Sequence, residues 1–180
     1  QADATRQLIR RLLTAPCPLV VDADALNAIA ADRSLLGQLR ADRVLTPHPG
    51  EMARLTGLPT AEVQRDRRGI ALRSAREWGA VVVLKGAHTI VAAPDGQVAE
   101  DPHEVPALGT GGTGDVLSGV IAGLLAQRLD PFRAAVSGVY VHAEAGRRIS
   151  ARLGPSGLLA SDLFDEIPLV MNALRQAATY

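Results

Sequence analysis

Apolar residues recur along the first part of the chain in two alternating patterns, one typical of helices and one of short buried strands. Residues 4–13 carry leucine and isoleucine at helical spacing, and the proline-containing segment TAPCP ends that helix. Residues 19–21 predict a buried strand that runs into two acidic residues, and residues 27–39 predict a second helix. The segment DRVLTPHPGE (42–51) predicts another short strand that leads into a proline-rich loop.

The middle of the chain continues this alternation. Residues 60–78 show a third helical pattern, for which Thr60 is a suitable N-cap. The segment AVVVLKGAHTIVAAPDGQVAE (80–100) predicts a strand, a turn at Lys85–Gly86 and a hairpin that closes at PDG. Residues 115–127 are apolar almost all round, which predicts a helix buried in the middle of the domain.

Helical patterns fill the C-terminal part. Pro131 opens a helix that runs to about residue 151, and residues 160–178 predict a short helix, a break at Pro168 and a last amphipathic helix. Alternating strands and helices, without repeats or linkers, predict one α/β domain with a mostly parallel central sheet flanked by helices. Only about three sheet strands are evident and the chain begins in a helix, so we expect an N-terminal part of the domain to be missing.

The composition restricts the class of protein. The 180 residues suit a single domain, and 3% aromatic residues require an aliphatic core. Nineteen basic and 19 acidic residues cancel, so there is no electrostatic case for a nucleic-acid or membrane partner. We see no signal peptide, and no uncharged apolar run approaches the ~20 residues of a membrane span. The single cysteine, Cys17, excludes an intramolecular disulfide, and together these features predict a cytoplasmic protein.

The densest cluster of glycines lies in the segment GTGGTGD (109–115), which matches the dinucleotide pattern G-x-G-x-x-G. The preceding residues, DPHEVPAL, contain two prolines and no strand pattern, and no acid ends a second strand about 20 residues later. The dinucleotide fingerprint therefore fails, and a Walker A loop fails because no Gly-Lys-Ser/Thr follows. Two interpretations stay open. The glycines and the helix start bind an anion beside Asp115, or they form a tight turn followed by an ordinary first-turn acid.

The segment GTGGTGDVLSGVIAGLLAQ resembles the anion-hole signature of the ribokinase-like superfamily. The segments VVDADALN, LTPHPGEMARL, VVLKGAHTIV and GLLASDLFDEIP are similar to those of the NAD(P)H-hydrate dehydratases and occur in the same order, from about residue 18 to 168. The resemblance implies a ribokinase-like layered fold and repair of the hydrated cofactors NADHX and NADPHX. It also implies ADP or ATP as co-substrate, with Mg²⁺. Residues 1–180 would then be the C-terminal two-thirds of one dehydratase domain.

The resemblance assigns roles to the glycine loop. Asp115 would contact the hydrated nicotinamide and accept the proton of its hydroxyl group. Gly114 would contact the adenine nucleotide, and the amides of Gly111, Gly112, Thr113 and Gly114 would form the anion hole for the transferred phosphoryl group. The implied route is phosphorylation of the hydroxyl group followed by loss of phosphate.

The same resemblance places the substrate near the strand ends. His48, held between two prolines, would contact the hydrate, and Glu51 is either a first-turn helix acid or part of a Mg²⁺ water network. Asp24 and Asn27 would lie near the substrate, and Asp22 is a weaker candidate.

The segment KGAHT matches the nucleotide-binding segment of the family, with Lys85 neutralising phosphate charge. We expect His88 to be exposed. His142 and Glu144, two residues apart on a helical pattern, do not share a face, and we expect both to be structural. The residues expected to bind the nucleotide here are Lys85, Gly86, Ala87, His88 and Thr89.

The chain departs from the family in three respects. Glu104 and Val105 stand where the family has Gly-Asn, we expect the N-terminal part that supplies substrate contacts to be missing, and these 180 residues show no trace of the epimerase domain that many bacterial members carry. Exposed sheet edges would make the isolated chain poorly soluble or oligomeric, and the resemblance itself implies a homo-oligomer and a preference for ADP. Two alternatives stay open: a kinase of hydroxymethylpyrimidine or thiazole alcohols, and a catalytically silent nucleotide-binding fragment.

Overall fold

A five-stranded sheet forms the centre of the computed structural model, which describes residues 2–178, with side chains from residue 4 onward. The strands follow one another in chain order across the sheet, so each pairs with its neighbour in sequence. The first three strands are parallel, and the last two add an antiparallel hairpin. The strands are β1 (Leu19–Val21), β2 (Arg43–Leu45), β3 (Val81–Leu84), β4 (Ile90–Ala92) and β5 (Val98–Glu100).

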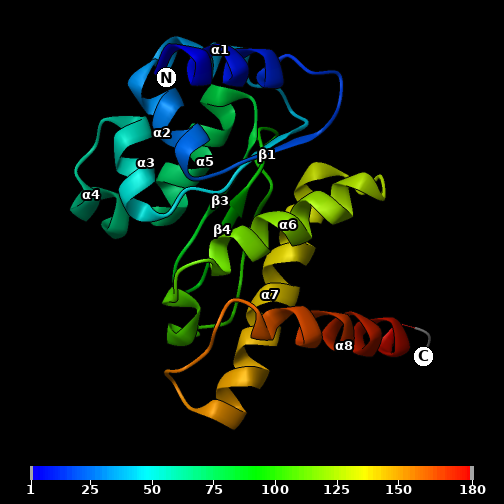
Figure 1. Cartoon of the computed structure of the whole chain (residues 1–180). Helices are drawn as coiled ribbons and strands as arrows, with labels where there is room; N and C mark the ends of the chain where they lie inside the picture. Colours follow the sequence, from blue (N-terminus) through cyan, green and yellow to red (C-terminus); the bar gives the residue numbers. More distant parts are fainter. Residues whose placement is uncertain (1, 179–180) are drawn as a thin grey trace.

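Helices cover both faces of the sheet, so the fold has three layers (Figure 1). Five helices and one 3₁₀ helix cover one face, whereas α6 and α7 cover the other and α8 packs against α7. This arrangement confirms the expected α/β layers. The helices are α1 (Ala2–Leu13), α2 (Asp24–Ala31), α3 (Pro49–Thr56), α4 (Thr60–Arg65), α5 (Arg67–Trp78), α6 (Thr113–Ala126), α7 (Pro131–Leu153) and α8 (Asp162–Ala177), with 3₁₀ helices η1 (Arg33–Gln38) and η2 (Pro106–Gly109).

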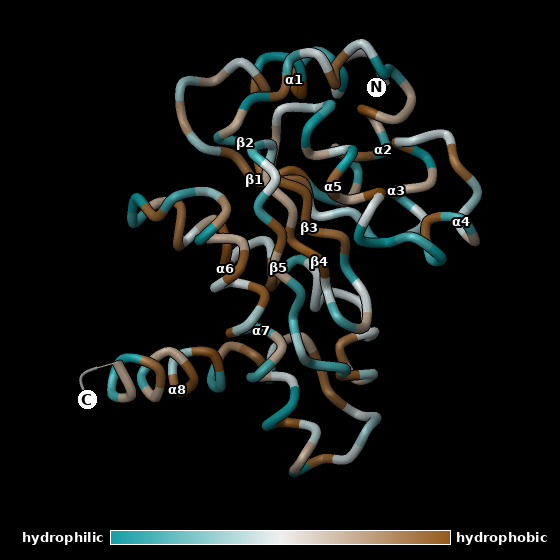
Figure 2. The backbone as a smooth tube through the Cα atoms, turned by 180° about the vertical axis from the view of Figure 1, so that it is seen from behind, coloured by the Kyte–Doolittle hydropathy of each residue, from teal (hydrophilic) through white to brown (hydrophobic). Residues whose placement is uncertain are grey.

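The central strand β3 shows why these residues form a sheet. Its four residues are all buried, because side chains that alternate between the two faces meet helices on both sides. Val82 and Leu84 pack against α1–α5, while Val81 and Val83 pack against α6 and α7. Figure 2 shows the hydrophobic residues running through β1 and β3.

Several predicted boundaries are wrong. The helix predicted over 27–39 ends at Ala31, because Asp32 leaves the helical conformation and its side chain accepts a hydrogen bond from the Ser34 amide. The pattern over 60–78 is broken at Asp66, whose carboxylate caps α5. Thr60 is the first helical residue of α4 and not its N-cap.

Three further predictions are corrected by the structure: the number of strands, the burial of α6 and the break at Pro168. The hairpin contributes two strands, so the sheet has five strands instead of about three. Helix α6 is buried on one face only, because Leu117 and Ile121 face the sheet and α7 while Gly119 and Gly123 are exposed. Pro168 does not break the last helix, which continues through it as α8. Within the described residues, no helix combines the length and apolarity needed to cross a bilayer.

Candidate active site

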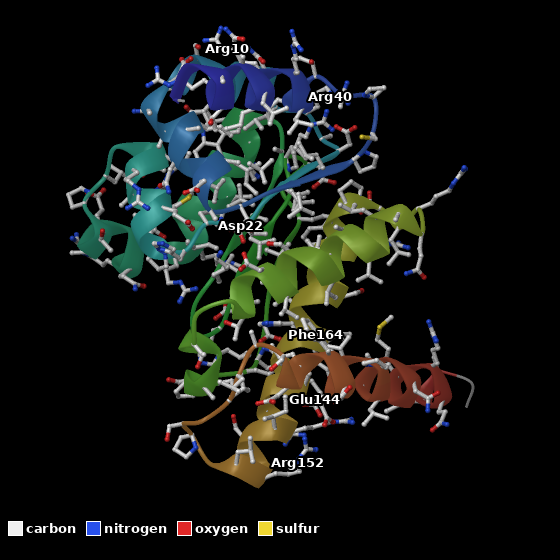
Figure 3. All side chains as sticks on the ribbon, viewed as in Figure 1. Arg10, Asp22, Arg40, Glu144, Arg152 and Phe164 are labelled. Atoms are coloured by element: carbon white, nitrogen blue, oxygen red, sulfur yellow. The ribbon has the colours of Figure 1, made fainter. Side chains whose placement is uncertain are left out.

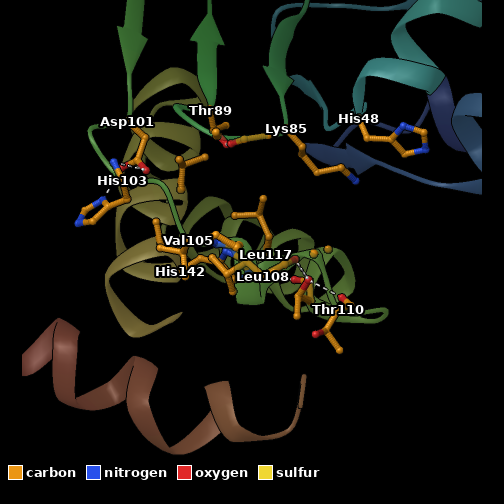
Figure 4. A pocket seen from close by; sticks show the side chains of 18 of the residues that line it. His48, Lys85, Thr89, Asp101, His103, Val105, Leu108, Thr110, Leu117 and His142 are labelled. Atoms are coloured by element: carbon orange, nitrogen blue, oxygen red, sulfur yellow. Dashed lines mark hydrogen bonds and ion pairs between the residues drawn. The ribbon is translucent and has the colours of Figure 1, made fainter. Parts of the chain in front are cut away.

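A cavity of about 600 Å³ opens where β2 and β3 end and α6 begins (Figure 4). The carboxyl ends of parallel strands are the usual place for ligands in open α/β sheets. His48 follows β2, Lys85 follows β3, and Gly111–Gly114 lead into α6, so three elements contribute to one wall. Lys85 extends from its strand towards His48, whereas Asp101 and His103 lie at the opposite side of the cavity.

The glycine loop is fixed by hydrogen bonds at the start of α6. Gly112 is the N-cap and has a left-handed φ of 89°, which favours glycine. The Thr113 hydroxyl lies 2.6 Å from the Leu108 carbonyl and 2.8 Å from the Thr110 carbonyl, so it closes the loop onto η2. The first-turn amides of a helix have no partner within the helix, and its dipole favours negative charge there. The loop can therefore bind an anion.

His142 holds this loop from α7. Its Nε2 atom lies 2.9 Å from the carbonyl oxygen of Thr113. Burial lowers the pKa of His142 to about 4, although the Thr113 carbonyl opposes this effect. At neutral pH the ring is thus uncharged, and it donates its Nε2 proton to that carbonyl. The residue expected to be structural does hold the loop in place, and it also lines the cavity.

Lys85 is the only lysine of the chain, and its ammonium group lies in a cluster of polar side chains. Nζ lies 2.8 Å from Oδ1 of Asp22 and 4.0 Å from Oε2 of Glu51. The Ser118 hydroxyl on α6 donates to Oδ2 of Asp22 at 2.8 Å. Figure 3 shows Asp22 near the centre of the molecule, beside the start of α6. Nζ would lie 3.4 Å from a Cβ placed on Gly114, so the ammonium group of Lys85 lies beside the glycine loop.

The Asp22 carboxylate is held in its charged form. Burial acts to raise the pKa of Asp22, but the hydrogen bond and charge of Lys85, with further hydrogen bonds from Ser118 and the Ala23 amide, outweigh it and lower the pKa. Its side chain is only 12% exposed, so these contacts are largely shielded from water.

His48 begins α3 with a reciprocal capping box. Its Nδ1 atom accepts from the amides of Gly50 and Glu51, at 3.0 and 3.3 Å, and Oε2 of Glu51 accepts from the His48 amide at 2.7 Å. Because Nδ1 is an acceptor, the proton of the neutral ring is on Nε2, which lies 3.7 Å from Oε1 of Glu51. Of the two roles expected for Glu51, the structure shows the first-turn helix acid.

A second cluster holds the far wall. His103 lies between two carboxylates, with Nδ1 2.9 Å from Asp101 and Nε2 3.3 Å from Glu144. Hydrogen bonds from Arg147, followed by Arg148, lower the pKa of Glu144 to about 2 despite its burial. Glu144 on α7 therefore holds His103, and with it the segment that precedes η2. This is a structural role, as expected.

The expected site residues divide into two groups. Asp115 is exposed in the first turn of α6 and has no hydrogen-bond or ion-pair partner in the described part of the chain. Asn27 accepts a hydrogen bond from Arg54 at 3.0 Å, Asp24 is exposed at the start of α2, and His88 is exposed as expected. These four residues and Glu51 are not among the residues lining the cavity. Those that line it are His48, Lys85, Gly86, Ala87, Thr89, Gly111, Gly112, Thr113 and Gly114.

Most of the opposite wall consists of residues that were not predicted from the sequence. Val139, His142 and Ala143 follow helical spacing on α7, so they share one face, but the same spacing is typical of any core position. The departure from Gly-Asn falls on this wall, because Glu104 and Val105 line the cavity. The lining residues that were not proposed are Pro49, Asp101, His103, Glu104, Val105, Pro106, Leu108, Gly109, Thr110, Leu117, Val139, His142 and Ala143.

Comparison with known proteins agrees with this geometry. The bifunctional NAD(P)H-hydrate repair enzyme Nnr of Moorella thermoacetica is 49% identical over 174 residues, which cover 96% of this chain and 33% of that enzyme. The ADP/ATP-dependent NAD(P)H-hydrate dehydratase of Bacillus subtilis, co-crystallised with ATP/Mg²⁺ and soaked with CoA, is 35% identical with a TM-score of 0.83. That match covers 95% of this chain and 62% of the Bacillus protein.

A third match concerns the fold alone. A ribokinase-like superfamily protein of Enterococcus faecalis has a TM-score of 0.77 at 24% identity, covering 93% of this chain and 58% of that one. The ribokinase-like fold is therefore confirmed. The chain spans about a third of the bifunctional relative and under two thirds of both solved structures. A family model described as NAD(P)H-hydrate dehydratase matches residues 1–169, and the chain therefore belongs to this family.

Proposed function

We propose that the protein is a nucleotide-dependent dehydratase that converts NADHX and NADPHX back into NADH and NADPH. The observation that carries this proposal is the placement of Lys85, His48 and the glycine loop along one wall of the cavity. The Lys85 ammonium group lies beside Gly114, and Asp115 follows Gly114 in the first turn of α6. Phosphoryl transfer needs positioning and charge stabilisation of this kind.

The nucleotide would bind with its phosphates at the glycine loop. Lys85 supplies positive charge, and the amides of Gly111, Gly112 and Gly114 supply donors, whereas the Thr113 amide already donates to the Thr110 carbonyl. Gly86, Ala87 and Thr89 form the adjoining wall. Val105, Leu108 and Leu117 provide an apolar surface for the base. The volume of about 600 Å³ lies within the range of about 300–1,000 Å³ that is usual for small-molecule sites.

The hydrate would bind on the other side of the terminal phosphoryl group. Its hydroxyl oxygen attacks phosphorus while Asp115, whose carboxylate is exposed and unpaired in the described part of the chain, accepts the hydroxyl proton. The bond from phosphorus to the nucleotide oxygen breaks. The lone pair of the ring nitrogen then expels phosphate to give an iminium ion, and loss of a proton from the neighbouring ring carbon to the released phosphate restores the alkene. His48 would orient the hydrate through its Nε2 proton, and Asp24 and Asn27 lie beyond it on α2.

The residues fit a hydrated Mg²⁺ shared with the nucleotide. Asp22 is already engaged by Lys85 and Ser118, which leaves Glu51, and within the described residues no group of three or more potential protein ligands is arranged around one point. Mg²⁺ commonly combines one or two carboxylates with waters and substrate phosphates. Glu51 would hold it through water, and the ion would neutralise phosphate charge when bound.

One assay tests the proposal. The full-length protein is incubated with hydrated NADH and either ADP or ATP, and the NADH absorbance band is followed. Nucleotide-dependent recovery of NADH is the expected result, with ADP the preferred co-substrate. Turnover of only a hydroxymethylpyrimidine or thiazole alcohol would instead indicate a kinase. Absence of both activities would indicate a catalytically silent nucleotide-binding fragment. Homo-oligomerisation stays a prediction, to be checked by light scattering.

A further inference from the structure

The choice of lysine at position 85 is itself informative. The chain has 19 basic residues, and 18 of them are arginine. Arginine presents a broad planar fork, whereas lysine presents a compact ammonium group with freely rotating donors. With Nζ only 3.4 Å from where a Cβ on Gly114 would be, this position favours the compact group. A lysine on a flexible stem needs other groups to fix its direction.

Asp22 supplies that direction. Oδ1 accepts from Nζ of Lys85 at 2.8 Å and from the Ala23 amide at 2.9 Å, and Oδ2 accepts from Ser118 at 2.8 Å. One carboxylate thus joins the end of β1, the end of β3 and the first turns of α6. Thr46, at the end of β2, lies 3.5 Å from the Ser118 hydroxyl and extends the contacts to the remaining parallel strand.

We propose that Asp22 is a positioning residue, which holds the Lys85 ammonium group at the first turn of α6 for the transferred phosphoryl group. The assignment of a phosphoryl group as the partner of Lys85 rests on the proposed function. The contacts argue against a direct metal role for Asp22, because both of its oxygens already accept hydrogen bonds from the protein. Asp22 acts on the reaction through Lys85, and it needs no contact with substrate.

The kinetic test is a double-mutant cycle of Asp22→Asn and Lys85→Met in the full-length protein. The asparagine would keep the side-chain shape but lose the charge, so Lys85 still attracts phosphate while its direction is lost. We expect kcat to fall by ~10- to 100-fold with little change in the KM for the nucleotide, as for a charge-assisted hydrogen bond that matters in the transition state. In the Lys85→Met background the same change should alter kcat by less than about threefold.

Asp95→Asn is the matched control. Asp95 is exposed in the β4–β5 turn, at the other end of these strands from Thr89 and Asp101, and the substitution should leave kcat unchanged. If Asp22→Asn does not fold, Ser118→Ala replaces it in the cycle, because it frees Oδ2 without touching Lys85. Equal losses in both backgrounds, or recovery of activity by added Mg²⁺, would overturn the proposal.

A second measurement needs no turnover. An amine acylating reagent is applied to the wild-type and variant proteins, and modification of Lys85 is followed by mass spectrometry. Loss of the hydrogen bond to Asp22 should make Lys85 react several-fold faster in Asp22→Asn but not in Asp95→Asn. Faster labelling in a protein without dehydratase activity would refute the proposed function and retain the role of Asp22. Unchanged labelling would refute that role.

Discussion

Acidification should destabilise the fold through His142. The side chain is buried, and burial lowers its pKa from 6.5 to about 4, with the Lys85 charge acting in the same direction and the Thr113 carbonyl against it. Between these two pH values the unfolded chain binds a proton at His142 that the folded protein does not bind. The free energy of unfolding therefore falls as the pH falls through this window. The difference between pKa values of 6.5 and about 4 corresponds to about 3 kcal/mol in the free energy of unfolding. This stability is fully present above about pH 7 and is lost as the pH falls.

The assay compares urea unfolding of the wild type and His142→Gln between about pH 7.5 and about pH 4.5. Glutamine keeps an amide donor for the Thr113 carbonyl but does not titrate. We expect the free energy of unfolding of the wild type to fall by about 2–3 kcal/mol more than that of the variant over this pH range. Asp22 and Glu144 are present in both proteins, so their titration cancels in the difference. Parallel pH profiles would show that His142 is not held neutral in the folded protein.

Three further substitutions test the loop and the fold. Asp115→Asn should lower NADH recovery at least ~100-fold with nucleotide affinity by calorimetry nearly unchanged; retained recovery would remove Asp115 from proton transfer. Gly112→Ala should reduce stability by about 1–2 kcal/mol in thermal unfolding, because φ is 89° and the new Cβ meets Ala160 at 3.2 Å. Arg43→Met should lower the free energy of unfolding by about 3 kcal/mol in urea, because buried carbonyls lose their donors. The exposed control, Arg40→Met, should lower it by under ~1 kcal/mol.

The layers of the fold could be predicted from local pattern, because β3 is a continuous apolar run and the helices carry clear periodicity. Element ends were harder to place. Asp32 and Asp66 end or begin helices through side-chain hydrogen bonds to nearby amides, which compete with helix continuation and have no periodic signature. The buried Arg43 was beyond prediction, since it reads as a surface residue. Its four hydrogen bonds go to carbonyls between residues 13 and 17, at the end of α1.

The candidate site divides in the same way. The wall made of His48, segment 85–89 and Gly111–Gly114 could be located because these segments resemble motifs of the family. The opposite wall combines the segment from Asp101 to Thr110 with single residues of α6 and α7, and these converge only after folding. Asp22 was a weak candidate for a related reason. Its importance comes from Lys85, 63 residues away in the chain, and Ser118, 96 residues away.

Helix α7 contacts both walls of the cavity and so fixes their relative position. His142 holds the start of α6 through Thr113, and Glu144 holds the segment before η2 through His103. The two residues are two positions apart, so they leave the helix in different directions and reach different walls. A rigid helix of 23 residues thereby fixes the separation between the glycine loop and the His103 segment. A displacement of α7 would therefore act on the start of α6 and on the His103 segment at the same time.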